Sequence, residues 1–121
     1  MNIYQEQILD HYHHPRNEGE PASFSHSCKL QNLSCGDEIE VFLTMENGKV
    51  KEMKFTGEGC AISIASASML SEKVAGKSVE EINLMDSDYM ADLLGIDLTP
   101  ARTKCAHLSL QAVQKALSPQ G

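Results

Sequence analysis

The sequence predicts an α+β fold, with an N-terminal helix, a three-stranded antiparallel sheet and a helical C-terminal half packed on one face of that sheet. Apolar and polar residues alternate between residues 26 and 56, and the central Asn47-Gly48 pair is a strong signal for a β-hairpin. From residue 60 onward the apolar residues recur at helical spacing. Strands followed by a run of helices are typical of the α+β class.

The N-terminal helix is predicted over residues 2–14. Ile3, Tyr4, Ile8 and Tyr12 recur at the spacing of one helix face, and Pro15 ends the helix. Residues 16–25 contain asparagine, glycine and proline, and they predict a loop.

Three strands follow. Residues 26–33 predict a weak strand, and residues 38–45 place Ile39, Val41 and Leu43 on one face. Residues 50–56 predict the return strand of the hairpin, because both positions of a two-residue turn need the positive φ that asparagine and glycine tolerate.

The C-terminal half is predicted to contain four helices. Residues 60–74 are rich in alanine, serine and isoleucine, and Gly76 suits the position after a helix end. A capping box begins at Ser78, which predicts a short helix to about residue 84. Residues 87–94 predict another short helix, and Pro100 suits the first turn of a last helix that runs to about Leu117.

Composition limits the function. The 121 residues suit one domain, 1–121, and a formal charge of −7 argues against nucleic-acid binding, which favours a basic face. No apolar run reaches the roughly 18 residues of a membrane helix, and no secretory signal pattern is present, so we expect a cytoplasmic protein without membrane contact. In a reducing compartment, the four cysteines favour metal or redox chemistry over disulfides.

Three of the cysteines lie where a loop meets a predicted helix or strand. Cys35 is separated from Asp37 by one glycine, Cys60 follows Gly-Glu-Gly, and Cys105 lies early in the last helix. Three thiolates and a carboxylate suit tetrahedral zinc, and thiolates also suit iron–sulfur clusters. The spacing forms no zinc-finger pattern, so spacing alone leaves open both a shared site and three separate buried cysteines.

The local motifs around these residues resemble one family. They are His-Pro-Arg-Asn at 14–17, Cys-Gly-Asp at 35–37, Gly-Glu-Gly-Cys-Ala-Ile-Ser-Ile-Ala-Ser-Ala-Ser at 57–68, Gly-Lys-Ser at 76–78 and Lys-Cys-Ala-His-Leu at 104–108. In this order, from about Tyr4 to Leu117, the chain resembles the NifU N-terminal, IscU and SufU family of iron–sulfur cluster assembly scaffolds.

The resemblance implies a function and a site. Family members accept sulfur from a cysteine desulfurase, build a transient [2Fe–2S] cluster from iron and that sulfur, and pass it to apo iron–sulfur proteins. It implies that Cys35, Asp37, Cys60 and Cys105 bind the cluster or metal, with Cys35 or Cys105 as the persulfide acceptor. A hard carboxylate is a poor partner for a soft cluster, which agrees with a site that must release its cargo.

One departure separates two branches of the family. IscU-type members have a histidine immediately before the last cysteine, whereas this chain has Lys104. A protonated lysine has no lone pair to donate, so Asp37 is the expected fourth ligand. Lys104 and Pro-Ala-Arg at 100–102 resemble SufU proteins, which hold Zn²⁺ and act as sulfurtransferase partners of a desulfurase. That branch also carries an insertion before its last cysteine that this chain is too short to contain.

We therefore rank three candidate functions. The first is a scaffold that is not a turnover enzyme, the second is a SufU-like zinc-dependent sulfur acceptor, and the third is a structural zinc module for interactions. Relatives that bind a chaperone carry Leu-Pro-Pro-Val-Lys where this chain has residues 98–102, which argues against that contact. Cys28 is expected to be a core thiol beside Leu30. His11, His13 and His14 are expected to form a solvated helix end, and His107 to face away from the site.

Overall fold

The computed structural model describes residues 2–33, 36–97 and 99–118. Its first element is helix α1 (Ile3–His13), which is followed by strands β1 (His26–Asn32), β2 (Asp37–Glu46) and β3 (Lys49–Glu58). Four helices complete the chain: α2 (Ala61–Val74), α3 (Val79–Asn83), α4 (Ser87–Leu94) and α5 (Pro100–Leu117). The α+β order predicted from the sequence is therefore confirmed, with element ends that shift by two residues at most.

Local sequence sets the helix ends. Asn2 and Ser78 each form a capping box. The side chain of the capping residue accepts the backbone N–H of the third helix residue, and the side chain of that third residue accepts the backbone N–H of the capping residue. Asp86 caps α4, and Thr99 caps α5 immediately before Pro100. The last helix thus starts at a fixed point, which determines where Cys105 lies.

The sheet has the order β1-β2-β3 with antiparallel neighbours. In its register, Leu30 is opposite Ile39, and Ile39 is opposite Gly57. Asn47 has φ +54° and Gly48 has φ +77°, as the predicted hairpin requires. A register shift between Thr44 and Met45 places a bulge near this turn, which the alternation of residues did not predict.

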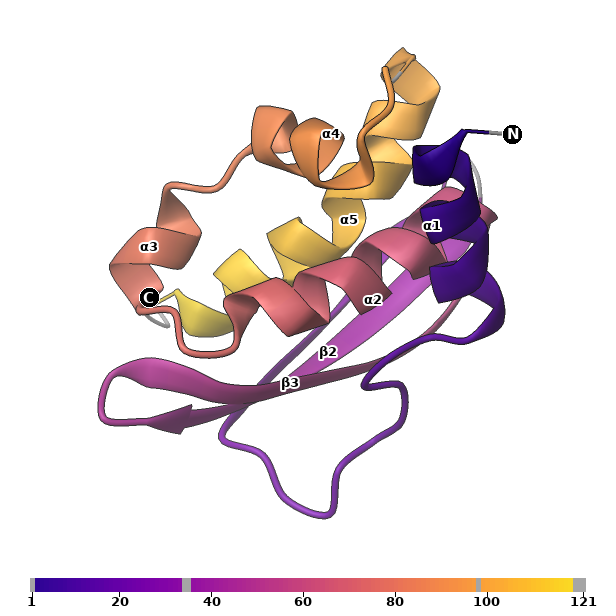
Figure 1. Cartoon of the computed structure of the whole chain (residues 1–121). Coiled ribbons are helices and arrows are strands. Elements are labelled where there is room, and N and C mark those ends of the chain that lie inside the picture. Colours follow the sequence, from indigo (N-terminus) through magenta and orange to yellow (C-terminus); the bar gives the residue numbers. More distant parts are fainter. Residues whose placement is uncertain (1, 34–35, 98, 119–121) are drawn as a thin grey trace.

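The helices cover one face of the sheet. In Figure 1, α2 and α5 lie on the same side of the sheet, and the contacts between elements place α2 on β3 and α5 on β1 and β2. The inward residues of β2 and the small residues of α2 are buried, so the hydrophobic core lies between these layers. Cys28 and Leu30 are half-buried against this core, and burial raises the pKa of the Cys28 thiol, as expected for a core cysteine.

One expectation about the first helix is wrong. His11 is only 6% exposed, and its Nδ1 lies 2.7 Å from Ser68 Oγ, so it packs between α1 and α2. His13 and His14 are exposed as expected. His11 is buried because α1 lies directly on α2. Among the described residues, no helix is long and apolar enough to cross a membrane.

Candidate metal centre

Three elements bring the predicted donor residues to one end of the sheet. Asp37 is the first residue of β2, Cys60 immediately precedes α2, and Cys105 lies in the second turn of α5. One donor atom from each of these residues lies within 4.8 Å of the other two. The fourth predicted donor, Cys35, lies outside the described residues. The structure therefore brings together every predicted donor that it describes.

The aspartate at this site is buried and held in place. Asp37 is 1% exposed; its Oδ1 accepts the backbone N–H of Cys60 at 3.0 Å and its Oδ2 accepts the Ser63 hydroxyl at 2.5 Å. The Cys60 N–H lies at the N-terminus of α2, where backbone donors have no partner within the helix and attract negative charge. Asp37 therefore takes the place of a capping side chain, which Cys60 itself does not supply.

Gly59 makes room for this arrangement. A Cβ atom at Gly59 would overlap the carboxylate of Asp37, so any larger residue would displace either the carboxylate or the start of α2. Gly36 has φ +75°, in the left-handed region that glycine tolerates best. Gly59 thus permits the close approach of Asp37 to the start of α2, whereas Gly36 permits the positive φ immediately before β2.

The two thiols of this centre that the structure describes differ in their access to solvent. Cys60 is exposed and Cys105 is 7% exposed, so a reagent from solvent meets the Cys60 sulfur first. The Cys60 Sγ atom lies 4.0 Å from Asp37 Oδ2 and 3.7 Å from Ser63 Oγ. Ligand atoms around tetrahedral zinc lie roughly 3.3–3.8 Å apart, given bonds of about 2.0–2.3 Å. The donor atoms of Asp37, Cys60 and Cys105 lie within 4.8 Å of one another, so the three side chains must move closer together to bind one metal ion.

Ser63 is a residue of the site that the sequence analysis missed. Besides its bond to Asp37, its Oγ lies 3.4 Å from the carbonyl oxygen of Cys105, and the residue is 1% exposed. It therefore connects the donors on β2, α2 and α5. The available signal was its position three residues after Cys60, which places both side chains on one face of the first turn of α2.

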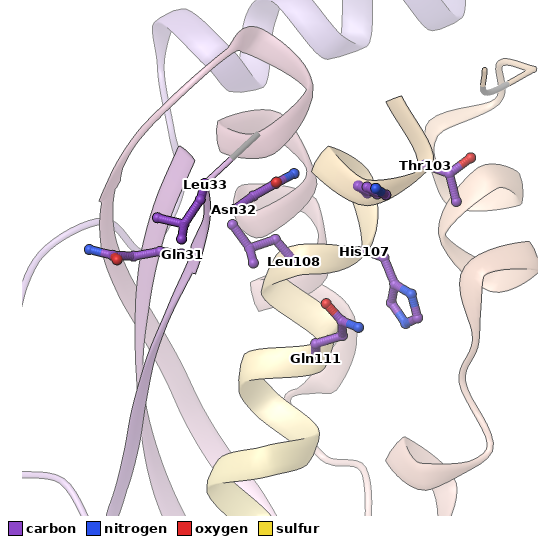
Figure 2. A pocket seen from close by; sticks show the side chains of 8 residues that line it. Gln31, Asn32, Leu33, Thr103, His107, Leu108 and Gln111 are labelled. Atoms are coloured by element: carbon purple, nitrogen blue, oxygen red, sulfur yellow. The ribbon is translucent and has the colours of Figure 1, made fainter. Parts of the chain in front are cut away.

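The remaining candidates lie around this centre. Lys104 is exposed and lines a groove of about 500 Å³ with Gln31, Leu33 and His107. Figure 2 shows Gln31 and Leu33 on the strand side of this groove and His107 on α5. Among the described residues, His107 does not belong to the donor cluster, and burial lowers its pKa. Arg102 is exposed and lines a separate apolar hollow with Ile8 and Ile62.

Comparisons with known proteins give consistent matches. The family model described as "NifU-like N terminal domain" matches residues 3–119. The zinc-dependent sulfurtransferase SufU of Bacillus subtilis is 36% identical over 135 residues, covering 98% of this chain and 91% of that protein. The iron–sulfur cluster assembly scaffold protein IscU of Thermotoga maritima is 34% identical over 134 residues, covering 95% and 92%.

A solved structure shows the same fold. The crystal structure of a SufU protein from Fervidobacterium islandicum AW-1, assigned as a cluster assembly scaffold for the SUF system, has a TM-score of 0.80 and 26% identity. The match covers 93% of this chain and 95% of that one. The alignments with the SufU protein of Bacillus subtilis and the IscU protein of Thermotoga maritima span 135 and 134 residues, so each includes positions that this 121-residue chain lacks.

Proposed function

The chain belongs to the family of NifU-like N-terminal domains, which includes the IscU and SufU proteins, and we propose that it is itself an iron–sulfur cluster assembly scaffold. One observation carries the proposal: Asp37, Cys60 and Cys105 converge within 4.8 Å at one end of the sheet. Cys35 is the fourth donor in this proposal. Iron and sulfide are cargo that these side chains hold and then release.

Sulfur enters as a persulfide carried by a cysteine desulfurase. A thiolate of this chain attacks the terminal sulfur of that persulfide, the donor's S–S bond breaks, and the donor cysteine leaves as a thiolate. Cys35 and Cys105 are the proposed acceptors. Cys105 is nearly buried, so its reaction requires a local opening beside the exposed Cys60.

Release depends on the carboxylate. Oδ2 of Asp37 already accepts the Ser63 hydroxyl, so a metal ion shares that oxygen with a hydrogen bond. A hard, shared oxygen is a weaker partner for a soft iron–sulfur cluster than a fourth thiolate would be. This donor set suits temporary holding, followed by transfer to an apo iron–sulfur protein.

A zinc-dependent sulfur acceptor is the second candidate. It is favoured by Lys104, which stands where IscU-type members carry a histidine, and by the similarity to a zinc-dependent sulfurtransferase. Two thiolates and one carboxylate also fit zinc, with Cys35 able to complete a tetrahedral set. In this alternative, the chain is a sulfurtransferase partner of the desulfurase and builds no cluster.

Anaerobic reconstitution separates the two candidates. The protein is incubated with ferrous iron, cysteine and a desulfurase, and sulfur-to-iron charge-transfer absorption is recorded in the visible range. A scaffold develops this absorption, and Cys60→Ser and Cys105→Ser lose it, while the matched control Cys28→Ser keeps it.

A different set of results would support each alternative. No absorption, together with faster desulfurase turnover on adding the zinc form, would replace the scaffold with the sulfur acceptor. If neither occurs and removing zinc merely unfolds the chain, the site is a structural zinc module. Metal analysis of freshly purified protein accompanies both assays.

A further inference from the structure

The two described cysteines of the centre also form a pair of neighbouring thiols. Cys60 immediately precedes α2, Cys105 lies in the second turn of α5, and these two helices are in contact. Their Sγ atoms lie within 4.8 Å of each other. The Oγ atom of Ser63, in the first turn of α2, lies 3.4 Å from the carbonyl oxygen of Cys105, so the segments that carry the two sulfur atoms touch directly. This pairing allows a reaction between the thiols that needs no metal ion.

A disulfide between these sulfur atoms is within the range of side-chain rotation. An S–S bond is about 2.05 Å long, whereas the two sulfur atoms lie at most 4.8 Å apart. Moving a cysteine side chain from one rotamer to another displaces its sulfur atom by about 3 Å, which covers that difference. Cys60 forms no side-chain cap of α2, and its sulfur atom lies 3.7 Å from Ser63 Oγ, which is a weak contact. The Cys60 side chain is therefore able to turn toward Cys105.

The exposure of the two thiols sets the order in which an oxidant reaches them. Cys60 is exposed, whereas Cys105 is 7% exposed, so an oxidant from solvent reacts first with Cys60. A sulfenic acid that forms next to a second thiol condenses with that thiol to a disulfide. Cys28 is poorly placed for this role, because it packs against the core outside the donor cluster and burial raises the pKa of its thiol. Among the described cysteines, Cys105 is the one that lies beside Cys60.

Two short hydrogen bonds of Asp37 do not involve a sulfur atom. Its Oδ1 accepts the backbone N–H of Cys60, and its Oδ2 accepts the hydroxyl of Ser63. A buried carboxylate destabilises a fold when it lacks such partners. Asp37 stays hydrogen-bonded when the two sulfur atoms are joined, and α2 keeps the cap at its N-terminus. We therefore expect the oxidised chain to keep its fold.

A bound metal ion and this disulfide exclude each other. The thiolate is the form of cysteine that binds metal, and a disulfide has no thiolate to offer. Joining Cys60 to Cys105 leaves Asp37 as the last of the three described donors. Conversely, thiolates bound to tetrahedral zinc lie roughly 3.8 Å apart, given Zn–S bonds of about 2.3 Å, which is too far for an S–S bond. The disulfide is therefore compatible with the metal-free chain alone.

We propose that Cys60 and Cys105 are a reversible redox switch, in which a disulfide formed in the metal-free chain prevents metal binding and blocks Cys105 as a sulfur acceptor. The oxidant is a peroxide, and a dithiol reductant restores both thiols. The regulatory meaning of the switch rests on the proposed function, whereas the disulfide itself requires neither a cluster nor a desulfurase. The switch can therefore fail while the proposed function stands.

The reaction balances with hydrogen peroxide as the oxidant. The Cys60 thiolate attacks one oxygen atom of the peroxide, the O–O bond breaks, and hydroxide leaves, so that Cys60 becomes a sulfenic acid. The Cys105 thiolate then attacks the Cys60 sulfur, the S–O bond breaks, and a second hydroxide leaves. The two protons released by the thiols convert both hydroxides to water. The thiols lose two electrons, which the peroxide gains, and a dithiol reverses the change by thiol–disulfide exchange.

Peptide mapping of the full-length, metal-free protein tests the pairing. The protein is treated with hydrogen peroxide, its remaining thiols are alkylated, and a digest is analysed by mass spectrometry without reduction. We expect a linked pair of peptides that contain Cys60 and Cys105, and its loss after treatment with dithiothreitol. Zinc binding, measured with a competing chelator, should disappear on oxidation and return on reduction. Sulfinic acid at Cys60 without a linked pair, or zinc binding that reduction does not restore, would overturn the proposal. Anaerobic cluster reconstitution of the reduced protein tests the proposed function separately.

Serine variants test which cysteines take part. Cys35→Ser should form the same linked pair at the wild-type rate, because Cys105 is the proposed partner of Cys60. In the Cys35→Ser background, adding Cys60→Ser should slow the oxidation of Cys105 by about tenfold, since the buried sulfur is shielded from the oxidant. Adding Cys28→Ser instead is the matched control and should change nothing. A disulfide to Cys35 in the wild type, or unchanged oxidation of Cys105 without Cys60, contradicts the assignment.

Zinc tests the link between metal binding and oxidation. With free zinc at a hundred times its dissociation constant, about 1% of the chain is metal-free, so the disulfide should form about a hundredfold more slowly. Magnesium at the same concentration is the control, because thiolates do not favour it as a ligand. Equal rates of disulfide formation with zinc and with magnesium would show that the metal does not control the pair, which would exclude the switch.

Discussion

At the scale of single residues, the buried carboxylate of Asp37 has a restricted choice of partners. It is 1% exposed, and its oxygens accept from the backbone of Cys60 and from Ser63. A buried carboxylate that loses a donor destabilises the fold, and a ligating carboxylate that loses a supporting bond binds metal less tightly. Ser63 should therefore affect both stability and metal affinity without touching solvent.

We expect Ser63→Ala to lower the free energy of unfolding of the metal-free protein by about 1–3 kcal/mol. The affinity for zinc should fall by roughly 10–100-fold, measured with a competing chelator. Ser66→Ala is the matched control, because Ser66 is also buried on α2 and its hydroxyl has no hydrogen-bond partner among the described residues. Equal losses in both variants would show that Ser63 contributes only packing.

Gly59 supports a second prediction at this scale. A methyl group there would overlap the Asp37 carboxylate, so Gly59→Ala should shift that side chain and weaken zinc binding. Gly59 has no positive φ that would add backbone strain, so the effect can be assigned to the steric overlap. If zinc affinity stays at the wild-type value, β2 and α2 can separate without cost, and the close approach has no functional role.

At the scale of elements, His11 couples α1 to α2. Its Nδ1 faces Ser68 Oγ at 2.7 Å, and that oxygen already accepts the backbone N–H of Arg16 at 2.8 Å. In the tautomer of neutral His11 that leaves Nδ1 without a proton, this nitrogen can accept the Ser68 hydroxyl, whereas a protonated ring can only donate to it. Burial lowers the pKa of His11 and nearby Arg16 acts in the same direction, while Glu72 and Asp10 partly oppose them.

The sign of the pH effect follows from this direction. Because the pKa of His11 is lower in the folded chain than in the unfolded one, the unfolded state binds more protons as the pH falls. The contribution of His11 to stability is complete above the unfolded pKa of about 6.5 and is lost as the pH decreases below it. We therefore expect the metal-free protein to become less stable between pH 7 and pH 5.

Urea unfolding at a series of pH values checks this prediction. His11→Gln should flatten the pH dependence of the unfolding free energy, whereas His13→Gln, an exposed histidine on the same helix, should leave it unchanged. Burial also lowers the pKa of His107, so the remaining slope should decrease further in a His11→Gln and His107→Gln double variant. Identical slopes for the His11→Gln variant and the wild type would exclude this coupling.

The elements themselves were largely predictable from local signals. Asn47-Gly48 located the hairpin, the capping box at Ser78 located α3, and Pro100 located the start of α5, because each motif acts within a few residues. The burial of His11 was not predictable in this way. Its partner, Ser68, lies 57 residues later in the chain, and only the packing of α1 on α2 brings the two together.

The donor residues of the candidate centre were predictable from motifs, whereas the serine that supports them was not. Asp37, Cys60 and Cys105, which the structure brings together, were predicted from their motifs, since spacing alone left separate core cysteines as an equal alternative. Ser63 was missed because a serine in a serine-rich helix carries no distinguishing signal. Its role depends on contacts from β2 and α5 that form only in the folded chain.

At the scale of the whole molecule, the centre connects layers that are distant in sequence. Asp37 belongs to β2, Cys60 to the start of α2 and Cys105 to α5, so a metal ion bound there ties the sheet to both covering helices. Unfolding separates these donors, and the unfolded chain binds metal less tightly. Metal binding should therefore stabilise the whole fold through mass action.

The size of this effect can be anticipated. With free zinc at a hundred times its dissociation constant, the stabilisation is about 2.7 kcal/mol. For a chain of this length, that corresponds to an increase in Tm of roughly 10 °C, measured by circular dichroism before and after removal of zinc with a chelator. Cys60→Ser and Cys105→Ser should lose most of the increase, and Cys28→Ser should keep it, since Cys28 packs against the core away from the donor cluster. An equal increase in all three variants would place the stabilising ion elsewhere in the molecule and would separate this centre from the stability of the fold.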